Sequence, residues 1–409
     1  MDRGPRPPAM PSSGAPLPAP AFQVMAKPRG AVCNLACDYC FYLSKEALYP
    51  GGRSRMSREV LEMLVRQRLE ANRSPEVTFD WQGGEPTLTG LDFFRQTVEL
   101  QRRCARPGVR VLNALQTNGT MLDREWCRFL RENGFLVGVS LDGPRDCHDA
   151  FRRDKAGAPT FERVMAGIAL LREERVDFNV LTCVHAANAG LGRDVYRFLR
   201  DEAGARVIQF IPVVERDGEG GPTPRSVSGK QYGAFLSAAF DEWIGRDVGR
   251  VFVQIFDVAL GIWSGHGATL CVFAETCVDA LALEHNGDLY SCDHFVDREH
   301  LLGNIAESPM AALAASDRQR RFGSDKRDRL PRFCRECLVR FACNGGCPKD
   351  RFLPTPDGEP GLNYLCEGYQ DFFTHVDRPM RTMAGLLRRR RSPSEIMNVR
   401  EIPLREGRP

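Results

Sequence analysis

The sequence has no apolar run that approaches the roughly 18 residues needed to cross a membrane. It also lacks a secretory signal, because Met1 to Pro20 is rich in proline and alanine but has no basic segment followed by an apolar core. Charge of one sign is not in excess: 56 Lys and Arg oppose 53 Asp and Glu, for a net charge of +3. We therefore expect a cytoplasmic protein with no membrane or nucleic-acid partner, and a disordered leader at residues 1–21.

Cysteine, in contrast, is abundant, with 15 in 409 residues. A secreted protein with disulfide bonds is the alternative that composition alone allows. The odd number of cysteines and the missing signal argue against it. In a reducing compartment, clustered cysteines more often bind metal, so the sequence predicts metal sites.

The most compact cluster is Cys33-x3-Cys37-x2-Cys40. Three thiolates with no nearby fourth Cys or His leave a tetrahedral zinc site one ligand short. A four-iron cluster tolerates this, because three irons bind the protein and the fourth stays open for another ligand. The alternative is three unrelated core cysteines, since free Cys is often buried. We expect an iron-sulfur cluster with an open iron.

Strand-like and helix-like segments alternate between residues 22 and 246. Strands are expected at residues 22–29, 77–82, 109–116, 135–141, 178–184 and 207–213, and helices at about residues 57–72, 91–104, 123–133, 160–174, 194–202 and 229–244. Six such units are too few for an eight-fold barrel. We therefore predict an α/β fold with a partial (β/α)6 barrel of the TIM type, which gathers ligands at the carboxyl ends of its strands.

Polar motifs follow several of these strands. Gln82-Gly83-Gly84-Glu85-Pro86 comes after the second strand, where glycines allow close backbone approach to a ligand and the Glu85 carboxylate can accept from a ligand ammonium group. Gln116 ends the third strand and Ser140 the fourth, with Asp142 close behind. Each motif alone is equally typical of an ordinary loop, but together they place polar groups at the ligand-binding end of the barrel.

A second group of cysteines begins after residue 265, where the alternation stops. Its members are Cys271, Cys277, Cys292, Cys334, Cys337, Cys343, Cys347 and Cys366. Eight thiolates are the number needed for two clusters with four protein ligands each, although Cys-x2-Cys pairs also build zinc sites. The remaining cysteines lack mutual ligand spacing, and we assign them to packing: Cys104, Cys127, Cys147 and Cys183.

The Cys33 to Cys40 run, the Phe41-Tyr42 pair after it and the Gly83-Gly84-Glu85-Pro86 turn resemble motifs of radical S-adenosylmethionine (SAM) enzymes. The resemblance implies a [4Fe-4S] cluster on the three cysteines, with SAM at its open iron. It implies that Arg152 faces the SAM carboxylate. The residues that it places around SAM are Gln82, Gly83, Gly84, Glu85, Gln116, Ser140 and Arg152.

The later cysteines, in the order C-x9-G-x4-C, C-x2-C-x5-C-x3-C, C, resemble the SPASM extension of radical SAM peptide-modifying enzymes, which carries two auxiliary [4Fe-4S] clusters. The resemblance implies a nearer cluster on Cys271, Cys277, Cys292 and Cys347, and a farther cluster on Cys334, Cys337, Cys343 and Cys366. We expect the barrel at residues 22–246, a connecting segment at 247–266, a smaller Cys-rich SPASM domain at 267–380 and an Arg-rich polar tail at 381–409.

Cys292-Asp293, followed by Leu301-Leu302-Gly303-Asn304-Ile305, resembles the anaerobic sulfatase-maturating enzymes. The resemblance makes Asp293 the base that takes a substrate proton, with His294 as the alternative proton carrier. It also places Tyr42 and Gln82 in the substrate pocket. The implied reaction oxidises a Cys or Ser in a Cys/Ser-x-Pro-x-Arg sulfatase peptide to Cα-formylglycine, after a 5′-deoxyadenosyl radical abstracts hydrogen from Cβ.

The implied partners are an unfolded sulfatase or another peptide, and an electron donor such as flavodoxin or ferredoxin. Two alternatives remain open. One is a radical SAM and SPASM maturase that oxidises or crosslinks a ribosomally made peptide. The other is a zinc-rich scaffold without catalysis that binds a partner protein.

Overall fold

The computed structural model describes residues 22–50, 54–277 and 280–398. The leader expected at residues 1–21 and the end of the expected tail, residues 399–409, lie outside this part of the chain. Among the helices of the described residues, none is both long and apolar enough to cross a membrane.

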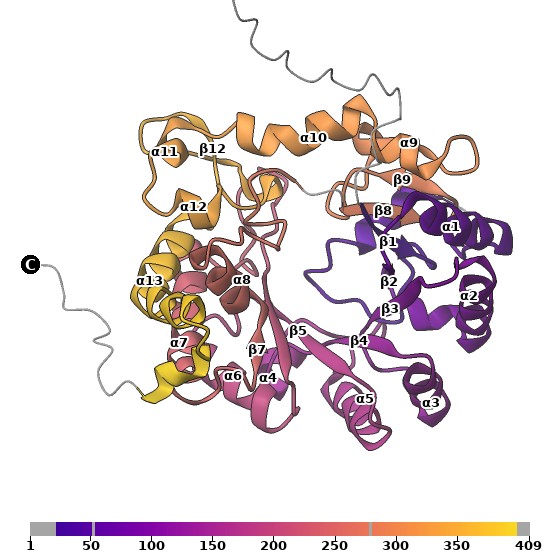
Figure 1. Cartoon of the computed structure of the whole chain (residues 1–409), viewed down its shortest axis with the longest axis horizontal. Helices are drawn as coiled ribbons and strands as arrows, with labels where there is room; N and C mark the ends of the chain where they lie inside the picture. The colour runs from indigo at the N-terminus through magenta and orange to yellow at the C-terminus, as the bar shows by residue number, and fades with distance from the viewer. Residues whose placement is uncertain (1–21, 51–53, 278–279, 399–409) are drawn as a thin grey trace, which may run out of the picture.

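Six parallel strands form the centre of a ten-stranded sheet (Figure 1). They are β1 (Gln23–Lys27), β2 (Glu76–Trp81), β3 (Arg110–Thr117), β4 (Phe135–Ser140), β5 (Phe178–Val184) and β6 (Val207–Pro212). The helices of this series are α1 (Arg58–Ala71), α2 (Leu91–Cys104), α3 (Arg124–Glu132), α4 (Arg145–Asp149), α5 (Phe161–Glu173), α6 (Gly192–Asp201) and α7 (Gly229–Arg246). The predicted (β/α)6 barrel is confirmed, and it is partial because the sheet stays open.

Local sequence explains why these elements form. The Asp123 side chain accepts a hydrogen bond from the Trp126 N–H (2.8 Å) at the start of α3, and Ser228 and Gln231 form a capping box at the start of α7. In β2, alternate side chains enter the core between the sheet and the helices, where Trp81 meets Phe93 and Phe94 of α2: these side chains are Val77, Phe79 and Trp81. The side chains between them point into the barrel.

The sheet extends beyond the predicted strands at both edges. Residues 247–266, expected as a connecting segment, contain β7 (Phe252–Val253) and α8 (Gln254–Trp263), and β7 pairs in parallel with β6. At the other edge, β8 (Ala280–Glu284) pairs in parallel with β1. The antiparallel strands β9 (Asp288–Tyr290) and β10 (Leu301–Asn304) follow. The Cys-rich part therefore shares the sheet of the barrel, and this long-range pairing has no local signal in the sequence.

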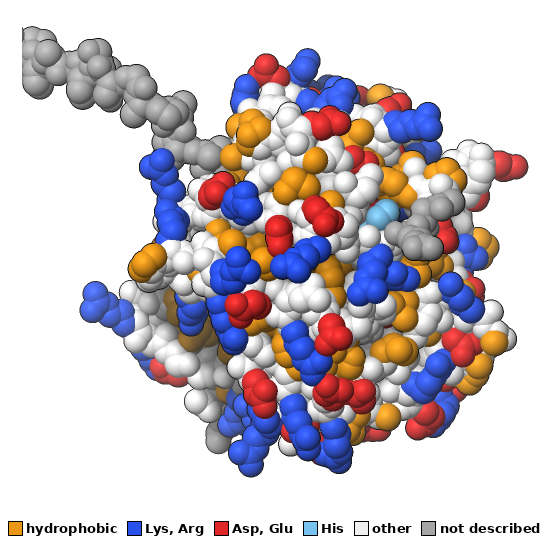
Figure 2. Space-filling view, turned by 90° about the vertical axis from the view of Figure 1, so that its right-hand side faces the viewer, with side chains coloured by type: hydrophobic (Ala, Val, Ile, Leu, Met, Phe, Trp, Pro, Cys, Tyr) orange, Lys and Arg blue, Asp and Glu red, His pale blue; other side chains and the backbone are white. Residues whose placement is uncertain are grey.

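The rest of the Cys-rich part consists of short helices and one long helix. Its elements are α9 (Met310–Ala314), α10 (Asp317–Asp328), α11 (Arg332–Arg335), α12 (Arg340–Cys343), β11 (Leu353–Pro354), β12 (Pro360–Leu362) and α13 (Cys366–Arg388). Short 3-10 helices occur along the whole described chain, at η1 (Leu43–Leu48), η2 (Pro86–Thr89), η3 (Arg298–His300), η4 (Pro348–Asp350) and η5 (Pro393–Asn398). Figure 2 shows basic and acidic side chains interspersed on one face of the molecule, as the balanced charge predicts.

Helix α13 extends into the segment that we expected as a polar, solvated tail. It runs to Arg388, with Met383 and Ala384 buried, and Ile396 of η5 is buried as well. Residues 381–388, expected as the start of the polar tail, therefore continue α13, because apolar side chains at helical spacing pack into the core. The arginines from Arg388 to Arg391 are exposed. Both α13 and η5 pack against α7.

Gly368 allows the close packing of α13 on α7. A Cβ at Gly368 would overlap the backbone of Gly229 and lie 2.9 Å from the Gly233 nitrogen. We expect Gly368→Ala to lower the free energy of unfolding by about 1–3 kcal/mol through overpacking. Thermal unfolding of the purified protein measures this effect.

Gly385, on the same helix, provides the matched control. A Cβ there would have no neighbour closer than 3.9 Å. Because alanine favours a helix interior over glycine, Gly385→Ala should be neutral or stabilise the protein by up to about 1 kcal/mol. Equal effects of the two substitutions would contradict the assigned packing.

Candidate active site

The loop that carries Cys33, Cys37 and Cys40 follows β1 and is fixed by the segment after α4. The Ala36 N–H donates to the Arg153 carbonyl (2.8 Å), and the Asp38 N–H donates to the Phe151 carbonyl (3.0 Å). Burial and, to a smaller extent, the neighbouring Cys40 thiol raise the pKa of the Cys33 thiol to about 11 and that of the Cys37 thiol to about 12. Thiols of this kind become thiolates only when a bound metal supplies positive charge.

The glycine turn after β2 packs against the backbone that leads into the Cys33 loop. The Gly84 N–H donates to the Gly30 carbonyl (2.7 Å), and the Glu85 N–H donates to the Val32 carbonyl (2.9 Å). A Cβ at Gly84 would overlap the Val32 carbonyl oxygen, and Gly83 has a φ of +126°. The two glycines therefore bring the turn onto the cysteine loop, which places both motifs at one site.

The Glu85 carboxylate does not take the role that we expected. It is 0% exposed, and four donors fill its two oxygens: the N–H and hydroxyl of Thr87 (3.0 and 2.7 Å), the Thr117 hydroxyl (2.8 Å) and the Asn118 N–H (2.7 Å). The prediction that Glu85 accepts from the SAM ammonium group is thus corrected: Glu85 joins the glycine turn to the end of β3. The Asn118 amide, held in this way, donates to the Cys33 Sγ (3.7 Å).

Gln116 and Ser140 lie together at the ends of β3 and β4, as predicted. The Gln116 Nε2 donates to the Ser140 Oγ (3.1 Å), and both side chains are half-buried. A Cβ at Gly138 would overlap the Gln116 side chain, so this glycine leaves room for it. The Gln82 side chain is half-buried and makes no hydrogen bond to any described residue, which leaves it free for a ligand.

Arg152 is paired with a protein carboxylate. Its Nε donates to the Asp142 Oδ2 (2.9 Å), and Asp142 also accepts from the Tyr39 hydroxyl and the Cys183 N–H (2.9 Å). Burial alone would raise the pKa of Asp142, but Arg152 and His185 outweigh it and hold this carboxyl ionised. The bond to Asp142 uses only the Nε of the five-donor Arg152 guanidinium, so the expectation that Arg152 faces the SAM carboxylate stays a prediction. Tyr39, inside the cysteine run, anchors the loop to this pair.

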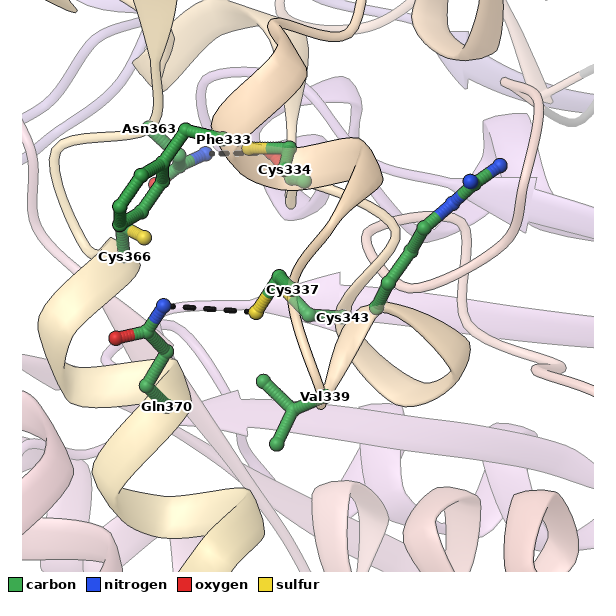
Figure 3. A pocket seen from close by; sticks show the side chains of 10 residues that line it. Phe333, Cys334, Cys337, Val339, Cys343, Asn363, Cys366 and Gln370 are labelled. Atoms are coloured by element: carbon green, nitrogen blue, oxygen red, sulfur yellow. Dashed lines mark hydrogen bonds between the residues drawn. The ribbon is translucent and has the colours of Figure 1, made fainter. Parts of the chain in front are cut away.

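Four of the later cysteines line one pocket beside α11, α12 and the start of α13 (Figure 3). They are Cys334, Cys337, Cys343 and Cys366, the set expected for the farther cluster. The Gln370 Nε2 donates to the Cys337 Sγ (3.5 Å) across this pocket (Figure 3). Burial raises the pKa of both Cys343 and Cys366 to about 12, and the other thiols of the set contribute.

The other four cysteines, Cys271, Cys277, Cys292 and Cys347, also lie close together. Burial raises the pKa of the Cys292 thiol, and the Cys347 and Cys271 thiols raise it further. Cys277 is likewise affected by Cys271. Within the residues described, no three His, Cys, Asp or Glu side chains converge on a single-ion position.

The four cysteines assigned to packing differ in their surroundings. Cys127 and Cys147 are buried, as expected. Cys104 is exposed at the end of α2, so it is a surface residue rather than a packing residue. Cys183 is half-buried and accepts a hydrogen bond from Arg152 (3.7 Å).

Asp293 follows β9 in the chain, and its carboxylate forms an ion pair with Lys27, the last residue of β1. The Lys27 side chain is 2% exposed and that of Asp293 is 14% exposed. Burial would raise the pKa of Asp293, but the Lys27 ammonium outweighs burial and holds the pKa below its usual value. Burial lowers the pKa of His294 to about 4, so this alternative proton carrier is a neutral and weak base at pH 7.

Tyr42 is 3% exposed, and its expected place in the substrate pocket stays a prediction. Its hydroxyl donates to Glu284, and its ring lies 4.6 Å from the Lys27 ammonium. The Tyr42 ring thus stabilises the charge of Lys27, because an aromatic face attracts a cation. The exposed aromatic side chain beside the site is Phe41 (46%), whose ring lies 4.9 Å from that of His294.

Sequence reasoning missed Lys27, Glu284, Tyr39 and His185. Lys27 is the only one with a local signal, a charged residue that ends an otherwise apolar strand before the cysteine loop. The other three gain their roles from partners that are distant in sequence: Glu284 lies 242 residues from Tyr42 and Tyr39 lies 103 residues from Asp142.

Two known protein families match this chain. The Radical SAM superfamily matches residues 28–190, and SPASM, an iron-sulfur cluster-binding domain, matches residues 271–338. A serine-type anaerobic sulfatase-maturating enzyme of Bacteroides thetaiotaomicron is 46% identical over 401 residues, which are 94% of this chain and 96% of that protein. A cysteine-type enzyme of Clostridium perfringens is 35% identical over 365 residues, which are 87% and 96% of the two chains.

The fold is also similar to two solved structures. "Native anSMEcpe with bound AdoMet" has a TM-score of 0.81 and 32% identity, and the match covers 89% of this chain and 100% of that one. "Native anSMEcpe with bound AdoMet and Cp18Cys peptide" has a TM-score of 0.80 and 32% identity, and covers 89% and 99%. The chain thus binds SAM and iron-sulfur clusters through a radical SAM domain and a SPASM domain, and it belongs to the anaerobic sulfatase-maturating enzymes, a family of radical SAM oxidoreductases.

Proposed function

We propose that this chain oxidises a Cys or Ser side chain of a sulfatase peptide to Cα-formylglycine. The observation that carries the proposal is the Asp293 carboxylate, which is kept ionised by Lys27 and is covalently adjacent to Cys292. The relatives named as serine-type and cysteine-type sulfatase-maturating enzymes support the substrate class. The peptide-bound structure of anSMEcpe supports a peptide as the binding partner. An electron donor of the flavodoxin or ferredoxin kind is the second proposed partner.

The cysteines fit the clusters that this function requires. We assign the first [4Fe-4S] cluster to Cys33, Cys37 and Cys40, and one auxiliary cluster to each group of four later cysteines. The support is chemical, because each group places several thiols together where only bound metal would keep them deprotonated. When bound, these groups and SAM would supply the 5′-deoxyadenosyl radical and accept the second electron.

The chain's own residues have distinct tasks in this scheme. The substrate loses a hydrogen atom from Cβ, a proton from its thiol or hydroxyl, and one further electron. Asp293 takes the proton, and Lys27 holds the carboxylate in its charged form. Gln82 offers an unused amide at the mouth of the barrel, and Phe41 offers an exposed aromatic face to a peptide.

Anaerobic incubation with SAM, a reductant and matched peptides tests the proposal. The peptides contain Cys-x-Pro-x-Arg, Ser-x-Pro-x-Arg or Ala-x-Pro-x-Arg. Mass spectrometry should show loss of two hydrogens from the Ser peptide, or loss of two hydrogens together with exchange of sulfur for oxygen in the Cys peptide, and no change in the Ala peptide. SAM cleavage without a change in the Cys or Ser peptide would instead favour a maturase of another peptide.

Removal of the Lys27 charge should lower the free energy of unfolding, because the ion pair with Asp293 is lost. Lys27→Met leaves the Asp293 carboxylate buried without a cation, and we expect a loss of about 3–5 kcal/mol in the free energy of unfolding. The double variant Lys27→Met/Asp293→Asn should recover part of this loss, since no unpaired charge remains. Denaturant unfolding at equal iron content measures both, and additive effects of the two substitutions would contradict a direct interaction.

A further inference from the structure

Lys326 of α10 is a buried cation next to the nearer group of cysteines. Its side chain is 1% exposed. The ammonium group donates three hydrogen bonds to backbone carbonyls, those of Cys271 (2.6 Å), Val272 (2.9 Å) and Ala274 (2.5 Å). All three of its N–H donors are therefore used by the loop that carries Cys271, and its charge stays beside that cysteine.

Arg351 is a second cation, located where the two groups of cysteines meet. Its donors bind the loop between Cys343 of the farther group and Cys347 of the nearer group, through the carbonyls of Asn344 (2.9 Å), Gly345 (2.9 Å) and Gly346 (3.2 Å). A fourth bond goes to the carbonyl of Lys326 (2.6 Å), so the two cations are tied together through the backbone.

Neither cation has an acidic partner. Among the described residues, no carboxylate lies within 4 Å of the Lys326 ammonium group or the Arg351 guanidinium group. Asp350, the acidic residue next to Arg351 in the chain, is paired with Lys349 (2.5 Å). A buried or half-buried cation without a counterion is costly, and anionic groups nearby would offset this cost. The thiols that interact electrostatically with Lys326 are those of Cys271, Cys277 and Cys347, and those that interact with Arg351 are Cys277, Cys334, Cys343 and Cys347.

We propose that Lys326 and Arg351 are positioning residues that compensate the negative charge of the two auxiliary clusters and raise their reduction potentials. This inference rests on the proposed assignment of the eight cysteines as cluster ligands. Reduction adds an electron to a cluster that already carries thiolate charge, and a fixed cation in a weakly polar interior favours the reduced form. Hydrogen bonding to backbone carbonyls alone fixes each cation without neutralising it.

The two positions predict different patterns of effect. The ammonium group of Lys326 donates to the Cys271 loop, so loss of this charge should act mainly on the nearer cluster. Arg351 lies on the loop that joins one ligand of each group, so its loss should act on both clusters. A purely structural role would produce no such pattern.

The test is a redox titration of the cluster-loaded enzyme, followed by electron paramagnetic resonance. Lys326→Met should shift the potential of the nearer cluster to more negative values, with a smaller shift of the farther cluster. Arg351→Gln should shift both. Lys326→Arg and Arg351→Lys keep the charge and should stay close to the wild-type values. The signal of the farther cluster is identified by its loss in Cys343→Ala.

Arg327→Gln is the matched control, because Arg327 is the next residue on α10 but is exposed and paired with Asp328 (2.7 Å). It should leave both potentials unchanged. Wild-type potentials in Lys326→Met and Arg351→Gln, at full iron content, would overturn the inference. Loss of clusters in Lys326→Met but not in Lys326→Arg would support it, since the arginine variant keeps the positive charge and the methionine variant does not. A wild-type enzyme that lacks the auxiliary clusters would instead refute the ligand assignment.

Discussion

Asp293→Asn is expected to lower the rate of peptide oxidation by about 10²- to 10⁴-fold while 5′-deoxyadenosine continues to form. The amide has nearly the shape of the carboxylate but cannot take a proton from the substrate heteroatom. SAM cleavage does not require that proton, so the ratio of 5′-deoxyadenosine to oxidised peptide should rise. Both products are measured in the same anaerobic reaction by chromatography and mass spectrometry.

Glu299→Gln is the control for this prediction. Like Asp293→Asn, this substitution replaces a carboxylate by an amide, but Glu299 lies six residues further along the chain and its side chain is exposed on η3. It should leave the oxidation rate and the product ratio unchanged. Unchanged peptide turnover in Asp293→Asn would remove Asp293 from the reaction and return attention to His294.

Cys33→Ala is expected to abolish reductive SAM cleavage. Loss of one of only three thiolates should prevent stable binding of the first cluster, and the iron content should fall from about twelve to about eight atoms per chain. Iron and sulfide analysis, together with 5′-deoxyadenosine formation, measures both effects. SAM cleavage at the wild-type rate in this variant would contradict the assigned cluster.

Cys343→Ala should show that SAM cleavage depends on the first cluster and not on the farther auxiliary cluster. It removes a ligand of the farther group, so iron should also fall by about four atoms, yet SAM cleavage should persist. Cys104→Ala should change neither quantity, because Cys104 is an exposed thiol at the end of α2. Zinc with negligible iron in the wild-type protein would contradict the cluster assignments as a whole.

The barrel was predictable because its signals are local. Periods of two and of about 3.6 residues mark strands and helices within short windows, and all six barrel strands lie within a few residues of their predicted positions. The strand β7 was missed because two residues carry no periodicity. The buried end of α13 was missed because the adjacent run of arginines suggested a solvated tail.

The cysteine groups were also predictable, because spacing and residue chemistry together restrict what thiols bind. The roles of polar side chains were less so. Glu85 had a plausible ligand contact from its place in the sequence, but its carboxylate is filled by donors on η2 and at the end of β3. The pairing of Arg152 with Asp142 could not be read from the sequence either, because it depends on the fold. The contact of the Tyr42 ring with the Lys27 ammonium group likewise had no signal in the sequence.

The sequence by itself determined the partial barrel, the three-cysteine loop at its ligand-binding end and the number of thiols available for two further clusters. These follow from local periodicity and from the affinity of thiolates for soft metals. Folding alone brings β8 beside β1, Asp293 beside Lys27, Lys326 beside the Cys271 loop and Arg351 beside the loop between Cys343 and Cys347. Those contacts join segments far apart in the chain, and their energies depend on burial and charge, which exist only once the chain has folded.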